Sequence, residues 1–232
     1  MWLKRYIILF GILFITHFCL VVFIFSIFDW LVLLGLTYFC LLPAFLSNAC
    51  MTFAGKFPVK LYPIDGGRMW KNTNKRILGD GKTWNGIIIG IFFSFLICLI
   101  TSFIYFPLAD ITIYRFELSS TVLKLFSQED ILFFVEIRDK FNNFLLRILL
   151  MSIGAPIGDL IGSFIKRRMG KERGVQIFLI DQLDFIAFSV IMVYPIFPIP
   201  WYFIIFIFIS TPLVAIFSNV VAYYLDLKKV PW

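Results

Sequence analysis

Three aspartates in the second half of the chain have a spacing that suits metal chemistry. Asp181 and Asp184 are three residues apart, so on a helix their carboxylates lie one above the other. Like charges so close repel one another unless a cation lies between them. Asp159 lies within an apolar stretch, where an ionisable group is costly unless it is paired or binds a cation. These three residues form a predicted Mg²⁺ site, because Mg²⁺ takes carboxylates and completes its shell with water and phosphate oxygens.

A basic run follows Asp159 in the same segment. Asp159, Ser163 and Lys166 are spaced i, i+4 and i+7, which places them on one face of a helix, and Arg167 and Arg168 come directly after. An internal ion pair of Asp159 with Lys166 or Arg147 is the alternative interpretation of this aspartate.

Segment 54–85 is rich in glycine and basic residues. Its glycines at 66, 67, 79 and 81 allow the backbone to approach a ligand closely, and Arg76 and Lys82 can neutralise phosphate. The GxxxxGK[ST] spacing of a Walker loop is absent. A basic loop with turn glycines that touches anionic lipid is the alternative interpretation.

The residue types favour metal-assisted phosphoryl or nucleotidyl transfer. The single histidine, His17, lies in the middle of an apolar stretch, so no Ser–His–Asp triad or Cys–His pair can be assembled in the polar segments. Transfer of a phosphoryl or nucleotidyl group needs cations around phosphates and carboxylates that hold Mg²⁺, and the chain contains both.

The elements that position these residues are predicted to be membrane-spanning helices. Of the 232 residues, 61% are hydrophobic and 15% are charged, which excludes a soluble globular enzyme, a disordered tail and a secreted disulfide scaffold. The apolar runs are too long for barrel strands. The sequence therefore predicts an all-α bundle, one integral membrane domain over 1–232 with a turn at Asp29-Trp30. The six predicted spans are 6–28, 31–53, 86–108, about 143–165, 176–196 and 199–225.

Lysine and arginine are distributed unevenly along the chain. The net charge is +7, and 16 of the 21 basic residues lie in the two ends, in loop 54–85 and in loop 166–175. The positive-inside rule predicts that these parts face the cytoplasm, where the two loops form the active site. Segment 109–142 is then an external insertion, in which Ser127 opens a capping box and an amphipathic helix.

At these residues the chain resembles the archaeal CDP-archaeol synthases, which are CTP:2,3-di-O-geranylgeranylglycerol-1-phosphate cytidylyltransferases. The S-x-x-K-R and D-x-x-D patterns also resemble bacterial CDP-diacylglycerol synthases, without the glycine-histidine stretch of those enzymes. The matching stretches are Pro43-Ala44-Phe45 with Asn48, Pro63 to Arg68, Arg76 to Trp84, Gly158 to Arg168, and Asp181 to Phe185.

The chain departs from the family pattern at a few places. Asn85 stands where the family usually has Arg, and Met51 stands where it usually has Pro. The N-terminal span and segment 109–142 look like additions to a five-span core. Asn85 bears on one phosphate contact and not on the class of reaction.

The resemblance implies transfer of CMP from CTP to 2,3-bis-O-(geranylgeranyl)-sn-glycerol 1-phosphate, with release of pyrophosphate. It implies a multi-pass protein of the cell membrane whose site faces the cytoplasm, with CTP, the lipid phosphate and membrane lipids as partners and no nucleic acid. The implied catalytic residues are Lys82, Asp159, Lys166, Asp181 and Asp184, with Mg²⁺ on the three aspartates. The implied substrate-binding residues are Asn48, Asp65, Gly66, Gly67, Arg68, Arg76, Gly79, Asp80, Gly81, Thr83, Ser163, Arg167 and Arg168.

Two other functions stay open on the sequence. A CDP-diacylglycerol synthase acting on phosphatidic acid would use the same residues, because the sequence does not distinguish the lipid tails. A transporter or channel whose buried aspartates bind an ion belongs to a different class. It predicts internal repeats, and the two halves of this chain share no motif.

Overall fold

Helices account for the architecture of the chain. A computed structural model describes residues 2–54, 60–71, 75–118, 125, 127–172, 175 and 177–225, and these residues contain seven helices and no strand. Five of the helices are long and apolar enough to cross a membrane, namely all except α4 and α6. The all-α prediction is confirmed for the described residues. The helices are α1 (Trp2–Ile24), α2 (Ile27–Phe53), α3 (Trp84–Leu118), α4 (Gln128–Asp139), α5 (Phe141–Arg168), α6 (Ile180–Val193) and α7 (Trp201–Tyr224).

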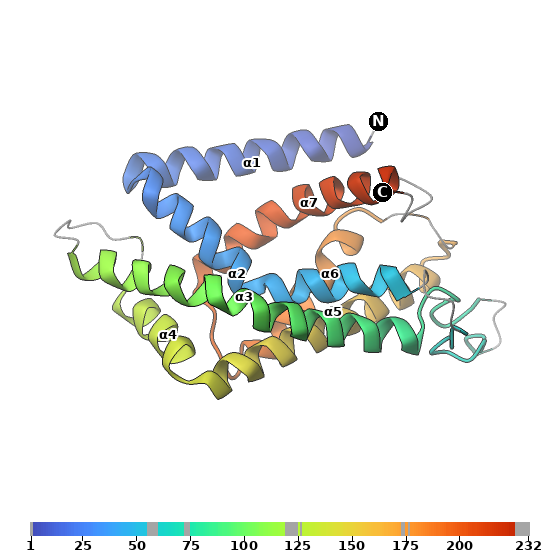
Figure 1. Cartoon of the computed structure of the whole chain (residues 1–232). Helices are drawn as coiled ribbons and strands as arrows, with labels where there is room; N and C mark the ends of the chain where they lie inside the picture. The colour runs from blue at the N-terminus through green and yellow to red at the C-terminus, as the bar shows by residue number, and fades with distance from the viewer. Residues whose placement is uncertain are drawn as a thin grey trace.

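The predicted span 176–196 is a short helix. α6 has 14 residues, or about 21 Å at 1.5 Å per residue, which is less than the roughly 30 Å of a bilayer core. Turns and prolines at 195, 198 and 200 separate it from α7. The prediction of six full-length spans is therefore wrong at α6, although α7 still carries the chain back to the end of the bundle where α1 begins (Figure 1).

The turn between the first two helices lies at Ser26 and not at Asp29-Trp30. The Ser26 hydroxyl accepts the backbone N–H of Asp29 at 3.1 Å and donates to its carboxylate at 2.5 Å, so Ser26 caps α2. Asp29 belongs to the first helical turn, where the helix dipole favours a negative charge. Asp29-Trp30 lies close to the connection between α1 and α2. Ser26, which precedes this pair and caps the helix, determines where α2 begins.

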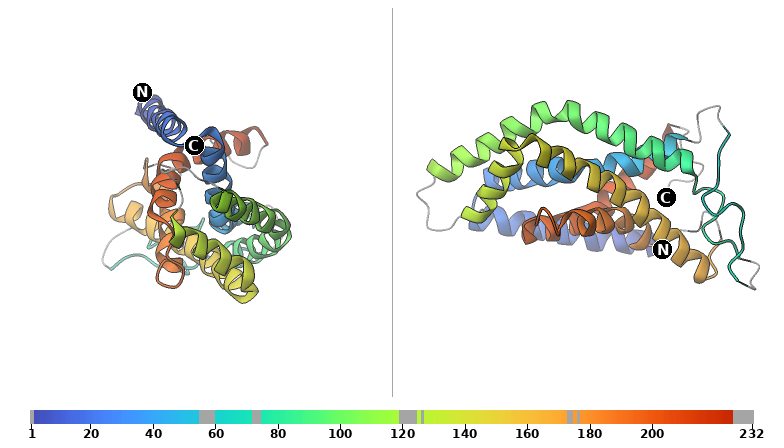
Figure 2. Two further views of the ribbon diagram at one scale, coloured as in Figure 1. Left: turned by 90° about the vertical axis from the view of Figure 1, so that its left-hand side faces the viewer. Right: turned by 90° about the horizontal axis from the view of Figure 1, so that it is seen from below.

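The predicted insertion 109–142 is mostly helical. α3 continues to Leu118, so its first ten residues extend a helix of 35 residues, or about 52 Å. The capping box at Ser127 is confirmed: its hydroxyl accepts the N–H of Asp130 at 3.2 Å, and the Asp130 carboxylate accepts the N–H of Ser127 at 2.7 Å. Figure 2 places α4 toward the end of the bundle away from the termini.

Glycines bring α5 and α6 into close contact. Gly154, Gly158 and Gly162 recur at every fourth position and face α6. A Cβ on Gly154 would lie 2.6 Å from the Cα of Ser189, and one on Gly158 would lie 2.6 Å from the carbonyl carbon of Asp184. Small residues at this spacing let two helix backbones approach. They therefore hold the start of α6 against the middle of α5.

Both basic loops lie at one end of the bundle. The described parts of the connections α2–α3 and α5–α6 lie beside the N- and C-terminal ends of the described chain, and the C-terminal end of α3 lies at the opposite end (Figures 1 and 2). The residues predicted to do chemistry are thereby gathered at the loop end. Which compartment that end faces stays a prediction from the charge distribution.

Candidate active site

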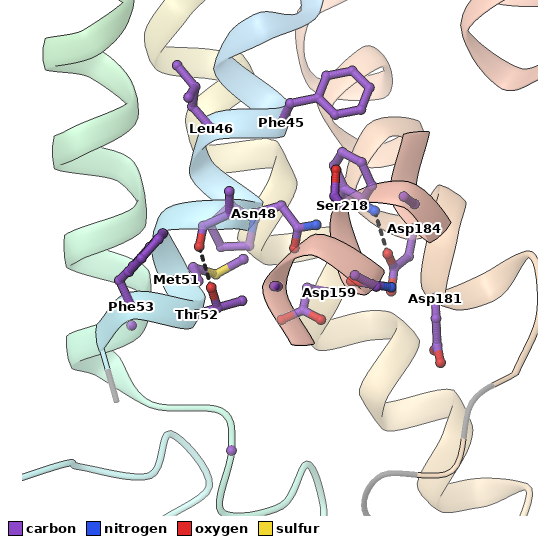
Figure 3. A pocket seen from close by; sticks show the side chains of 18 of the residues that line it. Phe45, Leu46, Asn48, Met51, Thr52, Phe53, Asp159, Asp181, Asp184 and Ser218 are labelled. Atoms are coloured by element: carbon purple, nitrogen blue, oxygen red, sulfur yellow. Dashed lines mark hydrogen bonds between the residues drawn. The ribbon is translucent and has the colours of Figure 1, made fainter. Parts of the chain in front are cut away.

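A cavity of about 950 Å³ lies at the loop end, between α2, α5, α6, α7 and loop 60–83. All five predicted catalytic residues line it, together with Asn48, Gly81, Thr83 and Ser163. Figure 3 shows the three aspartates grouped near the start of α6 and the facing part of α5, with Asn48 and Thr52 of α2 across from them. The fold therefore brings parts of α2, α5, α6, α7 and loop 60–83 to one space.

Lys82 and Asp159 form an ion pair across the cavity. The Lys82 Nζ lies 2.6 Å from Oδ1 and 2.5 Å from Oδ2 of Asp159, and each side chain is 25% exposed. The alternative interpretation, in which Asp159 pairs with Lys166 or Arg147, is therefore wrong. Lys82 comes from the loop and Asp159 from α5, so this pair fastens the loop over the cavity.

Lys166 pairs with Asp181 instead. Its Nζ lies 2.8 Å from Oδ2 and 3.0 Å from Oδ1 of Asp181, which joins the last turn of α5 to the first turn of α6. The backbone N–H of Ile177 also donates to Asp181 Oδ2 at 3.0 Å. Asp181 is thus held by a charge and by the loop that precedes α6.

Asp184 has a different environment. Its Oδ1 accepts the backbone N–H of Phe185 at 2.7 Å, and none of the ion pairs among the described residues includes it. Lys82 neutralises Asp159, and Lys166 neutralises Asp181. When Asp184 is ionised, the two lysines and three aspartates together therefore carry one negative charge. A cation would be attracted to this part of the cavity.

The donor set suits Mg²⁺, although the three carboxylates do not meet at one point. Within the described part of the chain, no three Asp, Glu, His or Cys side chains are close enough to hold a metal ion together. Carboxylate oxygens are nevertheless the ligands that Mg²⁺ takes, usually one or two at a time. Asp159, Asp181 and Asp184 line the same cavity, so the Mg²⁺ site stays a prediction that requires the lysines to move.

Asp65 organises the glycine-rich loop. Its carboxylate, 1% exposed, accepts Arg76 Nη2 at 2.6 Å and the backbone N–H groups of Leu78 and Gly79, each at 3.1 Å. Burial by itself raises the pKa of Asp65, but these hydrogen bonds outweigh it and hold the pKa well below its usual range. Gly79 has a φ of +107°, which side-chain-bearing residues rarely adopt. Asp65 therefore acts on the shape of the loop that presents Lys82.

Arg168 holds the same loop against α5. Its guanidinium stacks over the rings of Trp70 and Phe164, at 4.9 and 5.2 Å from their centroids, and its Nη2 donates to the carbonyl of Arg76 at 2.8 Å. Trp70 and Arg76 lie in different parts of loop 60–83, so these contacts link the C-terminal end of α5 to two parts of that loop. Arg168 was predicted to bind substrate, and the structure places it behind the loop and outside the cavity lining.

The remaining predicted substrate-binding residues also lie outside the cavity lining. Asp80 pairs with Arg76 at 2.6 Å, and Arg167 donates to the carbonyl of Lys171. Asn85, one of the departures from the family pattern, accepts the N–H of Tyr62 at 3.1 Å. The residues of this set that do not line the cavity are Asp65, Gly66, Gly67, Arg68, Arg76, Gly79, Asp80, Arg167 and Arg168.

The sequence reasoning missed the contribution of α7. Ser218 and Asn219 of that helix line the cavity, with Phe217 and Val221 beside them, and Tyr38 and Thr52 of α2 contribute from the other wall. Polar residues within an otherwise apolar run were the signal that could have identified them. The cavity is therefore charged at the aspartates and mostly apolar along α2 and α7, with polar groups of Thr52, Ser218 and Asn219 among the apolar side chains.

The fold and the site define an integral membrane protein with a charged, partly enclosed site at one end of a helical bundle. The family model for CarS-like CDP-archaeol synthase matches residues 30–137 and 118–232. The CDP-archaeol synthase of Methanosarcina mazei is 33% identical over 201 residues, which cover 83% of this chain and all of that protein. That of Thermococcus kodakarensis is 33% identical over 203 residues, covering 88% of this chain and 99% of that protein.

The chain belongs to the CDP-archaeol synthase family. A solved structure of an intramembrane enzyme for archaeal membrane lipids biosynthesis has the same fold, with a TM-score of 0.53 and 24% identity over 79% of this chain and 92% of that one. α1 precedes the residues that the family model matches. Its Tyr6 stacks on Phe178, centroid to centroid 3.7 Å, so this helix contacts the segment that leads into Asp181.

Proposed function

We propose that this cavity transfers CMP from CTP to 2,3-bis-O-(geranylgeranyl)-sn-glycerol 1-phosphate and releases pyrophosphate. The observation that carries the proposal is one cavity in which two Lys–Asp pairs and Asp184 adjoin an apolar wall. Its charged part suits phosphates, and its apolar part suits lipid tails. The family to which the chain belongs supports the choice of CTP and of an archaeal ether lipid.

The reaction requires the protein mainly to position the two substrates and to stabilise the negative charge of their phosphates. An oxygen of the lipid phosphate attacks the α-phosphorus of CTP in line, a P–O bond forms to CMP, and the bond to pyrophosphate breaks. The nucleophile is already an anion, so no strong general base is required. That agrees with the position of His17, the only histidine of the chain, on α1 and away from the cavity lining.

The two lysines would exchange partners when substrate binds. Phosphate oxygens compete for Lys82 and Lys166, and each lysine that turns to a phosphate frees the carboxylate that it neutralised. Asp159, Asp181 and Asp184 are the residues that would then hold Mg²⁺. Bound there, Mg²⁺ would offset the charge of the α-phosphate and of the leaving pyrophosphate.

The two substrates would reach the cavity by different routes. CTP would come from the loop end, which we assign to the cytoplasm because 16 of the 21 Lys and Arg lie on that side. The lipid would come from the bilayer and place its tails along the apolar side chains of α2 and α7, such as Phe45, Leu46 and Phe217. Cysteines introduced at Lys71 and Gly170 should therefore both label from the cytoplasm; labelling of the two loops from opposite sides would refute a single site.

The activity is tested with the purified full chain in detergent. Labelled CTP, Mg²⁺ and the geranylgeranyl ether-lipid phosphate should yield a CDP-lipid, and ATP or GTP should not replace CTP. A parallel reaction with phosphatidic acid separates this function from that of a CDP-diacylglycerol synthase. Faster turnover of phosphatidic acid than of the ether lipid would overturn the proposed substrate.

Lys82→Ala is the matched test of the site. Loss of one charge-assisted contact to phosphate costs about 1.5–3 kcal/mol, or about 10- to 150-fold at limiting CTP. Lys140→Ala is the control, because Lys140 is an exposed lysine on the far side of the bundle that pairs with Glu136. Equal turnover of the two variants would reduce the glycine-rich loop to a lipid-contacting surface.

A further inference from the structure

The three residues that lead into α6, 177–179, have an unusual backbone. Leu179 has a φ of +69°, a left-handed conformation that side-chain-bearing residues rarely adopt. Its side chain is 39% exposed, so burial of the leucine itself does not explain the conformation. A residue keeps a strained conformation only where its surroundings hold it. Segment 177–179 is therefore held by other groups.

α6 holds this segment from one side. The side-chain oxygen of Gln182 accepts the N–H of Leu179 at 2.6 Å, and Gln182 is only 1% exposed. Ile177 and Asp181 are joined twice, since the N–H of Ile177 donates to Asp181 Oδ2 at 3.0 Å and the N–H of Asp181 donates to the carbonyl of Ile177 at 3.1 Å. A movement of the segment would therefore move the Asp181 carboxylate.

α1 holds the segment from the other side. Four aromatic side chains recur at every fourth position of this helix and so share one face, namely Tyr6, Phe10, Phe14 and Phe18. The last two pack against Trp30 of α2, at 5.9 and 4.9 Å between ring centroids. The first two pack against Phe178: the ring of Tyr6 stacks on it at 3.7 Å with 12° between the planes, and that of Phe10 lies at 5.9 Å. The start of α1, at the loop end (Figure 1), is thereby fastened to segment 177–179.

We propose that Tyr6 is a positioning residue for the site, and that it holds the carboxylate of Asp181 in place through Phe178 and Ile177. Neither Tyr6 nor Phe178 lines the cavity, so the two rings act on the backbone of segment 177–179 and not on substrate. α1 precedes the residues that the family model matches. The stack therefore supports the site from a part of the chain that lies outside that match.

The stack matters most when Asp181 loses its lysine. The inference rests on the proposed function, in which a phosphate draws Lys166 away from Asp181. Among the described contacts of this carboxylate, the N–H of Ile177 then remains. A segment that Tyr6 holds in place keeps that N–H, and with it the carboxylate, in position at the cavity. Contacts of this kind orient the groups that bind a metal ion and so affect how tightly it is bound.

The first test does not involve turnover. It is hydrogen–deuterium exchange of the purified full chain in detergent, followed by mass spectrometry of peptides that span 177–183. Tyr6→Ala should make exchange of these peptides several-fold faster, because the N–H of Ile177 and that of Leu179 are then held less firmly. Tyr6→Phe keeps the ring and should exchange as the wild type does. Phe23→Ala is the control, since Phe23 lies on the same helix and is 91% exposed. The same exchange in Tyr6→Ala and in the wild type would overturn the proposal.

The second test is the kinetics of CMP transfer. Tyr6→Ala should lower kcat several-fold and shift the Mg²⁺ dependence to higher concentration, with little change in the KM for CTP, and Tyr6→Phe should restore both. Phe178→Ala should have the same effect, and its combination with Tyr6→Ala should add little, because the two rings form one contact. Faster exchange in Tyr6→Ala with an unchanged kcat and Mg²⁺ response would overturn the positioning role. A wild type that transfers no CMP, beside faster exchange in Tyr6→Ala, would instead refute the proposed function and keep the support of the segment by α1.

Discussion

Lys82 Nζ lies 2.5 Å from Asp159 Oδ2, although 77 residues separate the two in the chain. The pair joins a glycine-rich loop to the middle of a helix that crosses the membrane. Asp181 has its own lysine, whereas Asp184 has none among the described residues. The three aspartates therefore differ in how their charge is compensated, and substitutions should separate them.

Replacement of each aspartate by asparagine is expected to give two classes of stability. Asp159→Asn and Asp181→Asn strand a lysine and should lower stability without metal by about 1–2 kcal/mol, less than a fully buried pair because about a quarter of each aspartate is exposed. Asp184→Asn removes the uncompensated carboxylate and should hold or raise the Tm. All three should reduce CMP transfer and shift its dependence on Mg²⁺ to higher concentration.

The measurement is thermal unfolding without metal beside activity at varied Mg²⁺. Asp80→Asn is the control, because Asp80 is an exposed carboxylate outside the cavity lining. Three active asparagine variants with an unaltered Mg²⁺ response would remove the metal site from the proposed function.

Asp65 is expected to make the glycine-rich loop sensitive to acid. Its pKa in the folded protein lies below the ordinary value of 3.8. The unfolded chain therefore binds the proton more tightly, so ionised Asp65 stabilises the fold above about pH 4, and this contribution is lost as the pH falls below that value. Protease cleavage within 54–83 should accelerate as the pH is lowered from about 5 to 3, and the acid-stable protease pepsin suits the measurement.

Asp65→Asn should expose the loop to cleavage at neutral pH as well and should remove most of this pH dependence. Asp80→Asn is again the matched control, since both carboxylates bind Arg76 but the side chain of Asp80 is 62% exposed. The same pH profile in wild type and in Asp65→Asn would show that Asp65 does not hold the loop.

Gly158 is expected to control the position of Asp184. An added Cβ would lie 2.6 Å from the carbonyl carbon of Asp184 and 3.0 Å from the Cα of Phe185, so α6 has to move away from α5. Gly158→Ala should lower stability by about 1–3 kcal/mol and reduce activity beyond what the stability loss explains. Gly11→Ala, at a helical glycine whose added Cβ would meet no neighbouring side chain or helix within 4 Å, should leave activity unchanged and should not lower stability. A fully active and stable Gly158→Ala protein would contradict the close packing.

Arg168 is expected to act on CTP binding through the loop. Arg168→Ala removes the stacking on Trp70 and the hydrogen bond to the carbonyl of Arg76, so the loop that carries Lys82 is held less firmly. The KM for CTP should rise more than kcat falls, and proteolysis of the loop should accelerate. Arg168→Lys should rescue little, because lysine lacks the planar guanidinium that stacks. Arg167→Ala, which removes a bond to the carbonyl of Lys171 and no hydrogen bond or ion pair to the described part of loop 60–83, should leave proteolysis unchanged.

Much of this protein could be predicted from short stretches of sequence. The hydrophobic runs determine that the chain is a bundle of membrane helices, and the Ser127 capping box begins α4 where the sequence predicts it. The five residues expected to be catalytic, Lys82, Asp159, Lys166, Asp181 and Asp184, all line one cavity, and their roles stay a prediction. Hydropathy and capping are properties of short windows, so they do not depend on the rest of the fold.

Other features depend on how distant parts of the chain pack. The sequence offered Lys166 and Arg147 as partners of Asp159, but Lys82 occupies that place because the loop folds back over α5. Asp65 resembles a ligand-binding residue in sequence, yet its carboxylate is used within the loop by Arg76. The packing of distant parts of the chain likewise determines the length of α6 and the part of the cavity lining that α7 contributes. The sequence determines which charges and apolar surfaces exist, whereas the packing of the helices decides which buried charges find a partner within reach, as Asp159 and Asp181 do and Asp184, among the described residues, does not.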